Sequence, residues 1–224
     1  MLRAPAAEFI GTMLFVLVGA GSIVANVNGP NGALGIALAH GVGLAVVVTI
    51  FMPISGGHIN PAVSVALWIG NVIDARTLGR YVLAQLLGAI VGALLIKLLF
   101  PTSLARLASL GTPQMSGAMG MWAGIALEAV FTFFLVSAVF GTCVNPQAQR
   151  VGGFAIGLTV LTVAVGGGNL TGAVMNPARA FGPALVSGDW HTQGLYWVGP
   201  LIGAALAGLA WKYLLLPRNA TDLT

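Results

Sequence analysis

The chain has 224 residues, of which 58% are apolar and only 6% are charged. Soluble domains carry charges on about a quarter of their residues, so this composition excludes an ordinary soluble protein and indicates an integral membrane protein. The net charge of +4 comes from nine scattered Lys and Arg residues, which argues against a nucleic-acid partner. Because Cys143 is the only cysteine, neither an internal disulfide nor a cysteine-based metal cluster can form.

Six long apolar segments follow one another along the chain, at 6–27, 33–53, 78–99, 118–140, 151–167 and 194–216. Most are long enough to cross a hydrocarbon core of about 30 Å, and the fifth is close to the short limit. Six spans place both termini on one side of the membrane. That side would carry six basic residues against two (Lys97 and Arg106) on the other: Arg3, Arg76, Arg80, Arg150, Lys212 and Arg218. The excess predicts that both termini are cytoplasmic.

A repeated tripeptide follows the second and the fifth segments, as Asn60-Pro61-Ala62 and Asn176-Pro177-Ala178. Asparagine is a favoured N-cap and proline is tolerated at the first helical position, so each tripeptide predicts a helix start. The two helices would cover 61–69 and 177–186. At 1.5 Å per residue each is about 14 Å long, roughly half of the hydrocarbon core. Two such half-helices can meet at the midplane, which predicts a pore or a binding site there.

The two halves of the chain match each other. Glu8 and Thr12 correspond to Glu128 and Thr132, and a constant offset of 115 relates three residues of the third span to three of the sixth: Tyr81, Gly88 and Lys97 with Tyr196, Gly203 and Lys212. Three spans per half is an odd number, so the halves must be oppositely oriented. We therefore expect one transmembrane channel domain over 1–224, with inverted repeats at about 1–100 and 118–216.

The stretches 55–63 (SGGHINPAV) and 172–184 (GAVMNPARAFGPA) resemble the aquaporin (major intrinsic protein) family, and the similarity extends over essentially the whole chain. The resemblance implies an all-α membrane protein, with six transmembrane helices and two re-entrant half-helices in an inverted 3+3 repeat forming a right-handed bundle. It also implies a homotetramer, without a cofactor or a metal. The implied function is a passive channel that conducts single-file water and excludes ions and protons.

A water pore is also consistent with the physics of these stretches. Irregular backbone is tolerated at mid-membrane depth only where it is buried or lines a wet path. The carbonyl groups before each half-helix would then accept hydrogen bonds from water, and the Asn60 and Asn176 amides would donate to it. The positive ends of both half-helices would repel cations. The predicted carbonyl ladder comprises Gly56, Gly57, His58, Ile59, Gly172, Ala173, Val174 and Met175.

Arg179 lies one helical turn after Asn176, and His40 is expected at a similar depth in the second span. The resemblance assigns the narrowest ring of the pore to His40, Ala164, Ala173 and Arg179. Bacterial water channels carry Phe at the first of these positions and His at the second, whereas His at the first is similar to plant vacuolar aquaporins. Two alanines predict a constriction wide enough for ammonia, hydrogen peroxide, urea or glycerol. The ordinary pKa of histidine, about 6.5, suggests that His40 could make flux pH-sensitive.

Two points argue for water over glycerol and against other protein classes. Ala180 and Ala184 stand where glycerol channels carry an acid and a base. Glu8 and Glu128 could form a proton relay in a secondary transporter, but we favour the interpretation that each accepts hydrogen bonds from a re-entrant loop. The sequence contains neither a nucleophile–base pair nor a phosphate-binding loop, so we do not expect an enzyme. The expected partners are water, small neutral solutes and membrane lipid, and the expected location is a bacterial inner (plasma) membrane.

Overall fold

The computed structural model describes residues 2–149 and 151–217, and in this part of the chain every regular element is a helix. Arg150 and Arg218, which entered the charge count above, lie outside the described residues. Six helices are long and apolar enough to cross a membrane, as predicted. They are α1 (Arg3–Ala25), α2 (Gly32–Ser55), α4 (Ala75–Leu99), α6 (Met121–Val139), α7 (Gly152–Thr171) and α9 (Gln193–Ala210). The fifth span ends at Thr171 rather than at 167, so it also has full membrane length.

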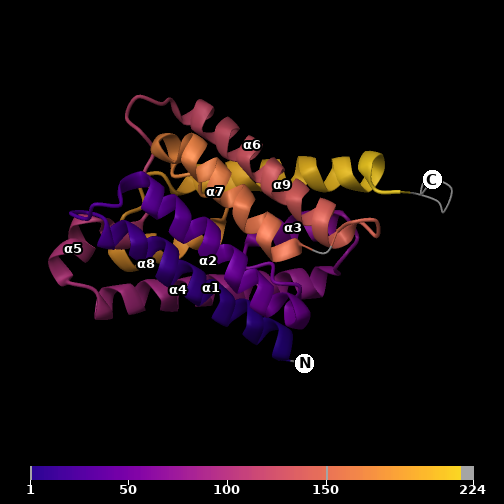
Figure 1. The fold of residues 1–224 in the computed structure, drawn as a ribbon, viewed down its shortest axis with the longest axis horizontal. Coiled ribbons are helices and arrows are strands. Elements are labelled where there is room, and N and C mark those ends of the chain that lie inside the picture. The colour runs from indigo at the N-terminus through magenta and orange to yellow at the C-terminus, as the bar shows by residue number, and fades with distance from the viewer. Residues whose placement is uncertain (1, 150, 218–224) are drawn as a thin grey trace.

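The ends of two spans depart from α-helical geometry. Single π-helical turns extend α6 over Phe140–Val144 and α9 over Trp211–Leu215. Both turns lie at the end of the bundle where the described chain begins and finishes (Figure 1). We call this end the terminal face and the other end the distal face.

The half-helices are α3 (Pro61–Ile69) and α8 (Pro177–Ser187). Each begins with extended backbone at its asparagine, whose side-chain oxygen accepts hydrogen bonds from the first free amides of the helix. Asn60 Oδ1 accepts from Ala62 N at 2.8 Å, and Asn176 Oδ1 accepts from Ala178 N at 3.1 Å. The predicted N-caps are therefore present at both tripeptides.

The long helices pair in the same way in both halves: α1 packs on α4, and α6 packs on α9. A glycine makes each approach possible. A Cβ atom added at Gly88 would overlap the carbonyl oxygen of Phe9, and one added at Gly203 would overlap that of Ala129. These two glycines are 115 positions apart, so the packing repeats with the sequence and confirms the inverted 3+3 arrangement. A helix α2–α7 contact then joins the two halves.

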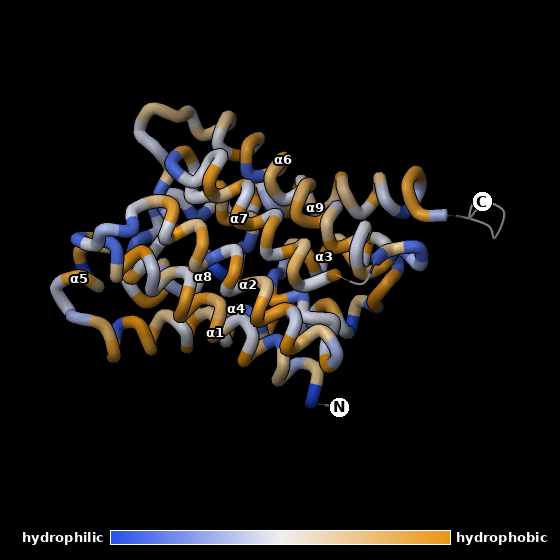
Figure 2. The backbone as a smooth tube through the Cα atoms, viewed as in Figure 1, coloured by the Kyte–Doolittle hydropathy of each residue, from blue (hydrophilic) through white to orange (hydrophobic). Residues whose placement is uncertain are grey.

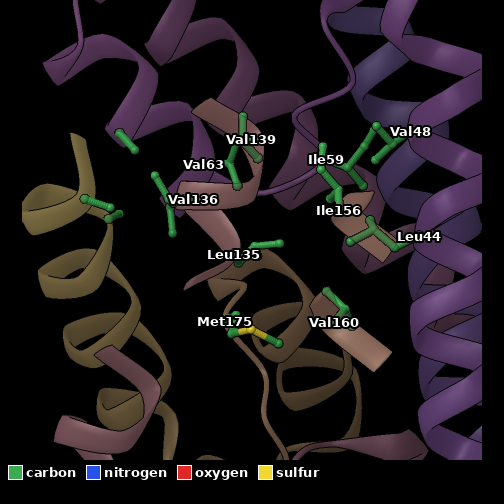
Figure 3. Packing of buried hydrophobic residues seen from close by; sticks show 14 of the residues in the cluster. Leu44, Val48, Ile59, Val63, Leu135, Val136, Val139, Ile156, Val160 and Met175 are labelled. Carbon is green, nitrogen blue, oxygen red and sulfur yellow. The ribbon is translucent and has the colours of Figure 1, made fainter. Parts of the chain in front are cut away.

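The surface and the interior of the bundle differ in kind. Figure 2 shows hydrophobic residues along the lengths of the helices and hydrophilic residues both at the two ends and within the bundle, and many large apolar side chains of the spans are exposed, as expected for a protein surrounded by lipid. Inside, branched side chains from four helices pack into one apolar cluster (Figure 3). It includes Leu44, Val48, Val63, Leu135, Val139, Ile156 and Val160.

One segment was not expected from the sequence. Between α4 and α6 the chain forms a short helix, α5 (Thr102–Leu107), and a 3₁₀ turn, η1 (Ser109–Gly111). Ala105 and Leu110 are buried against α1 and α4, which anchors the segment on the distal face. It is too short to span the membrane, so hydropathy gave no sign of it, but its last residue reaches the site described next.

Candidate functional site

The two half-helices meet tip to tip through their asparagines. Asn60 Nδ2 donates to the carbonyl oxygen of Met175 at 2.8 Å, and Asn176 Nδ2 donates to that of Ile59 at 3.0 Å. Each half-helix is thus tied to the loop that leads into the other. A side-chain amide carries two N–H groups, so each asparagine keeps one donor beyond this crossed pair. Both asparagines line the central cavity.

Glu8 of α1 holds the loop before α3 through hydrogen bonds to its carboxylate. One carboxylate oxygen accepts from His58 N at 2.9 Å and from Ser55 Oγ at 2.6 Å, and the other accepts from Ile59 N at 2.6 Å and Gln85 Nε2 at 2.7 Å. Four donors therefore converge on a carboxylate without solvent exposure. Such charge-assisted bonds compensate for burying the charge and fix the loop in a non-helical conformation.

Glu128 of α6 has the same task before α8. It accepts from Thr171 Oγ1 at 2.7 Å, from Val174 N at 2.9 Å and from Met175 N at 2.7 Å. The carboxylate is likewise fully buried. Both buried acids are thus occupied by backbone and hydroxyl donors of their loops.

Arg179 extends from the first turn of α8 and is held from two sides. Its Nη1 donates to the carbonyl oxygen of Gly111 at 2.9 Å, and its Nε and Nη2 lie 3.3 Å and 3.2 Å from His40 Nε2. The guanidinium has five N–H groups, so two remain beyond these contacts. The contact between Arg179 and His40 agrees with the equal depths expected from the sequence.

The hydrogen bonds of His40 define its tautomer. Its Nδ1 lies 2.9 Å from the carbonyl oxygen of Ile36, which can only accept, so Nδ1 carries the proton. Arg179 can only donate, so Nε2 must present its lone pair to the guanidinium. The ring is therefore neutral in this arrangement. Adding a proton at Nε2 would break the contact and place two cations side by side.

Three cavities follow one another from the distal face to the terminal face. The outer cavity has a volume of about 210 Å³, the central cavity about 30 Å³ and the inner cavity about 420 Å³. His40 and Ala173 line both the outer and the central cavity, and Gly56 and His58 line both the central and the inner one. The central cavity has the smallest volume of the three, and both asparagines line it.

The residues predicted for the narrow ring come together, since His40, Ala164, Ala173 and Arg179 all line the outer cavity. Gly172 lines it too, and the central cavity is lined by Gly56, Gly57, His58 and Val174. The remaining tripeptide residues form the buried first turns of the half-helices: Pro61, Ala62, Pro177 and Ala178.

Two members of the predicted carbonyl ladder need correction. The carbonyl oxygens of Ile59 and Met175 accept the crossed asparagine amides, and neither residue lines any of the three cavities. Both have positive φ angles, 55° and 52°, which turn their carbonyl groups toward the opposite half-helix. Sequence reasoning counted every unwound residue as equivalent, whereas the last one in each loop has a structural partner.

Sequence reasoning also missed two contributors. Gly111 supplies the carbonyl that holds Arg179. Its φ of 75° favours glycine, and a Cβ atom there would also overlap the backbone of Ala20. Gln85 bridges Glu8 to Ser64, whose hydroxyl lies 3.0 Å from His58 Nδ1. A polar residue within an apolar span is itself a signal, so Gln85 could have been noticed, but nothing in the sequence links Gly111 to Arg179.

Comparison with known proteins agrees with this architecture. The profile of the family described as Major intrinsic protein matches residues 1–211. Aquaporin TIP2-3 of Arabidopsis thaliana is 44% identical over 224 residues, covering 94% of this chain and 86% of that protein. Aquaporin-4 of Mus musculus is 40% identical over 223 residues, covering 96% of this chain and 68% of that protein. The aquaglyceroporin of Plasmodium falciparum has the same fold, with a TM-score of 0.87 at 22% identity, covering 100% of this chain and 99% of that one.

These relatives bear on the expected location. The structure has six membrane-spanning helices, and the two aquaporins compared above by sequence are from a plant and a mammal. They give no support to the expectation of a bacterial inner membrane.

Proposed function

The chain belongs to the major intrinsic protein family, whose members are membrane channels rather than enzymes, and from this premise we propose that it is a passive water channel. Water passes in single file, and ions and protons are excluded. The whole of 1–224 acts as one channel domain, with both termini cytoplasmic. Tetramers are typical of the family, and we propose that this chain conducts through each protomer of a homotetramer.

The observation that carries the proposal is the crossed asparagine pair. Because each amide uses one N–H on the opposite loop, only one donor per asparagine is left for the central cavity. The facing wall is apolar, formed by side chains such as Leu44, Val63 and Ile156 (Figure 3). Water molecules there have donors on one side and no competing partner on the other, which favours a single file with oriented molecules.

Exclusion of cations follows from charge placement. The N-termini of α3 and α8 converge at the asparagines, so two positive helix ends face the central cavity. Arg179 adds a full positive charge in the outer cavity. An uncharged water molecule is little affected by either feature, whereas a cation would meet both in sequence.

A second candidate is a facilitator of small neutral solutes such as ammonia, hydrogen peroxide, urea or glycerol. The observation in its favour is the pair Ala164 and Ala173, which leaves the outer cavity without a bulky side chain beside Arg179. A secondary transporter is less well supported, since transporters use an unpaired intramembrane acid and both Glu8 and Glu128 are fully engaged.

Stopped-flow light scattering on reconstituted vesicles tests the proposal. Under an impermeant osmolyte, vesicles with the protein should shrink faster than empty ones, and Asn60→Asp and Asn176→Asp variants should lose this gain. Re-swelling in glycerol or urea measures the second candidate in the same preparation. Water permeability equal to that of empty vesicles would overturn the water channel, and solute flux without water flux would favour the facilitator.

A further inference from the structure

Two lysines related by the internal repeat have different surroundings. Lys212, near the end of the sixth span, donates from Nζ to the carbonyl oxygen of Ile69 at 3.1 Å and to Asn71 Oδ1 at 3.1 Å. It thereby closes the C-terminal end of the half-helix α3. Its counterpart Lys97 lies at the end of α4, beside the C-terminal end of α8, where Val186 and Ser187 share a cavity with it.

Lys97 does not repeat that contact. Over residues 2–149 and 151–217, neither the Lys97 side chain nor the Arg106 side chain makes a hydrogen bond or an ion pair. Both side chains are exposed, and both line one cavity of about 490 Å³ on the distal face. We call it the Lys97–Arg106 pocket; its other lining includes Thr102, Ala105, Val186 and Ser187. Two uncompensated cations thus face one hollow.

The acid of the neighbouring loop does not neutralise them. Asp189 Oδ2 accepts from Gln114 at 2.7 Å, and its other oxygen faces the His191 amide at 3.5 Å. Ser109, which also borders the pocket, donates to Asp189. Asp189 itself is not part of the lining, so the pocket keeps an excess of positive charge.

We propose that the Lys97–Arg106 pocket binds the phosphate headgroup of an anionic phospholipid in the leaflet at the distal face. The two cations suit a phosphodiester, and the Thr102 hydroxyl offers a further hydrogen bond. Leu98 and Leu107, which are 77% and 73% exposed, are next to the two cations in the sequence. They provide apolar contact for acyl chains, which a free phosphate would not use. The pocket lies away from the three pore cavities, so the proposal is independent of what the channel conducts.

A site-specific quenching experiment tests this proposal. A fluorophore is attached at Ser103→Cys, an exposed position on α5, in a Cys143→Ser background. The labelled protein is placed in phosphatidylcholine nanodiscs with rising fractions of either phosphatidylglycerol or phosphatidylcholine that carries a nitroxide on its acyl chain. The nitroxide-bearing phosphatidylglycerol should quench the fluorophore at a clearly lower lipid fraction than the nitroxide-bearing phosphatidylcholine does. Lys97→Gln/Arg106→Gln should reduce that preference by roughly 10- to 30-fold, the effect of two cations near a lipid headgroup.

The matched control is Arg76→Gln/Arg80→Gln, which removes the same charge from two exposed positions at the other end of α4. It should leave the preference intact, and water permeability of both double variants should match that of the parent, as expected for folded channels. Equal quenching by the two lipids, or a preference that survives loss of both pocket cations, would overturn the proposal. Removal of the preference by inorganic phosphate, but not by chloride at equal ionic strength, would assign the site to free phosphate and also overturn it.

Discussion

Replacing Arg179 with valine tests how this channel excludes cations. Among the described residues that line the outer cavity, Arg179 alone carries a full charge. A monovalent cation about 4 Å from the guanidinium, at an effective dielectric constant of about 20, is repelled by about 4 kcal/mol. Loss of that barrier corresponds to a roughly 1000-fold higher cation or proton permeability at this point. Water is uncharged, so its permeability should stay within the same order of magnitude.

The assay uses one vesicle preparation for three fluxes. Light scattering reports water, an entrapped pH-sensitive dye reports protons under a potassium diffusion potential, and an entrapped potassium indicator reports the metal cation. Arg179→Lys is the matched control, because it keeps the charge but loses the forked contacts to His40 and Gly111. It should keep most of the exclusion. Proton and potassium fluxes that are unchanged in the valine variant, with normal water flow, would refute the role of Arg179 and leave exclusion to the asparagine pair alone.

Four further outcomes are expected. Glu128→Gln should lower the free energy of unfolding by about 2–3 kcal/mol in detergent denaturation, because an amide replaces an oxygen that accepts a buried N–H; an unchanged midpoint would contradict this. Gly111→Ala should release the arginine and raise proton flux, while an intact proton barrier would count against that contact. Water flux should not change from about pH 5 to 8, contrary to the initial expectation for His40, because Nε2 of His40 already accepts from Arg179. A change in flux near pH 6.5 would support the initial expectation instead. Burial opposes ionisation of Asp189, but hydrogen bonds from the His191 amide and from neighbouring side chains together lower its pKa below the ordinary 3.8. Its loop contacts should therefore be complete above that pH and be lost as the pH falls through the lowered value; Trp190 fluorescence measures this, and the transition should be absent in Asp189→Asn.

The sequence by itself determined the spans, the half-helices and the inverted repeat. Each depends on a local free energy: transfer of an apolar segment into lipid, or an N-cap satisfied within three residues. Glu8 and Glu128 were also found from sequence, because two symmetric acids inside apolar segments need partners and the unwound loops supply them. The close approach of helices at Gly88 recurs at Gly203, because the two glycines occupy equivalent positions of the internal repeat.

Only the tertiary structure decided which groups meet across the bundle. Arg179 is held by Gly111, 68 positions away on a segment that hydropathy does not reveal, and the carbonyl groups of Ile59 and Met175 turn from the pore toward the opposite asparagine. Lys97 and Lys212 are equivalent in sequence, yet within the described part of the chain only Lys212 finds a carbonyl partner. Such contacts depend on where loops come to rest after the helices pack, and a hydrogen bond a few ångströms long is sensitive to shifts that leave hydropathy and capping unchanged.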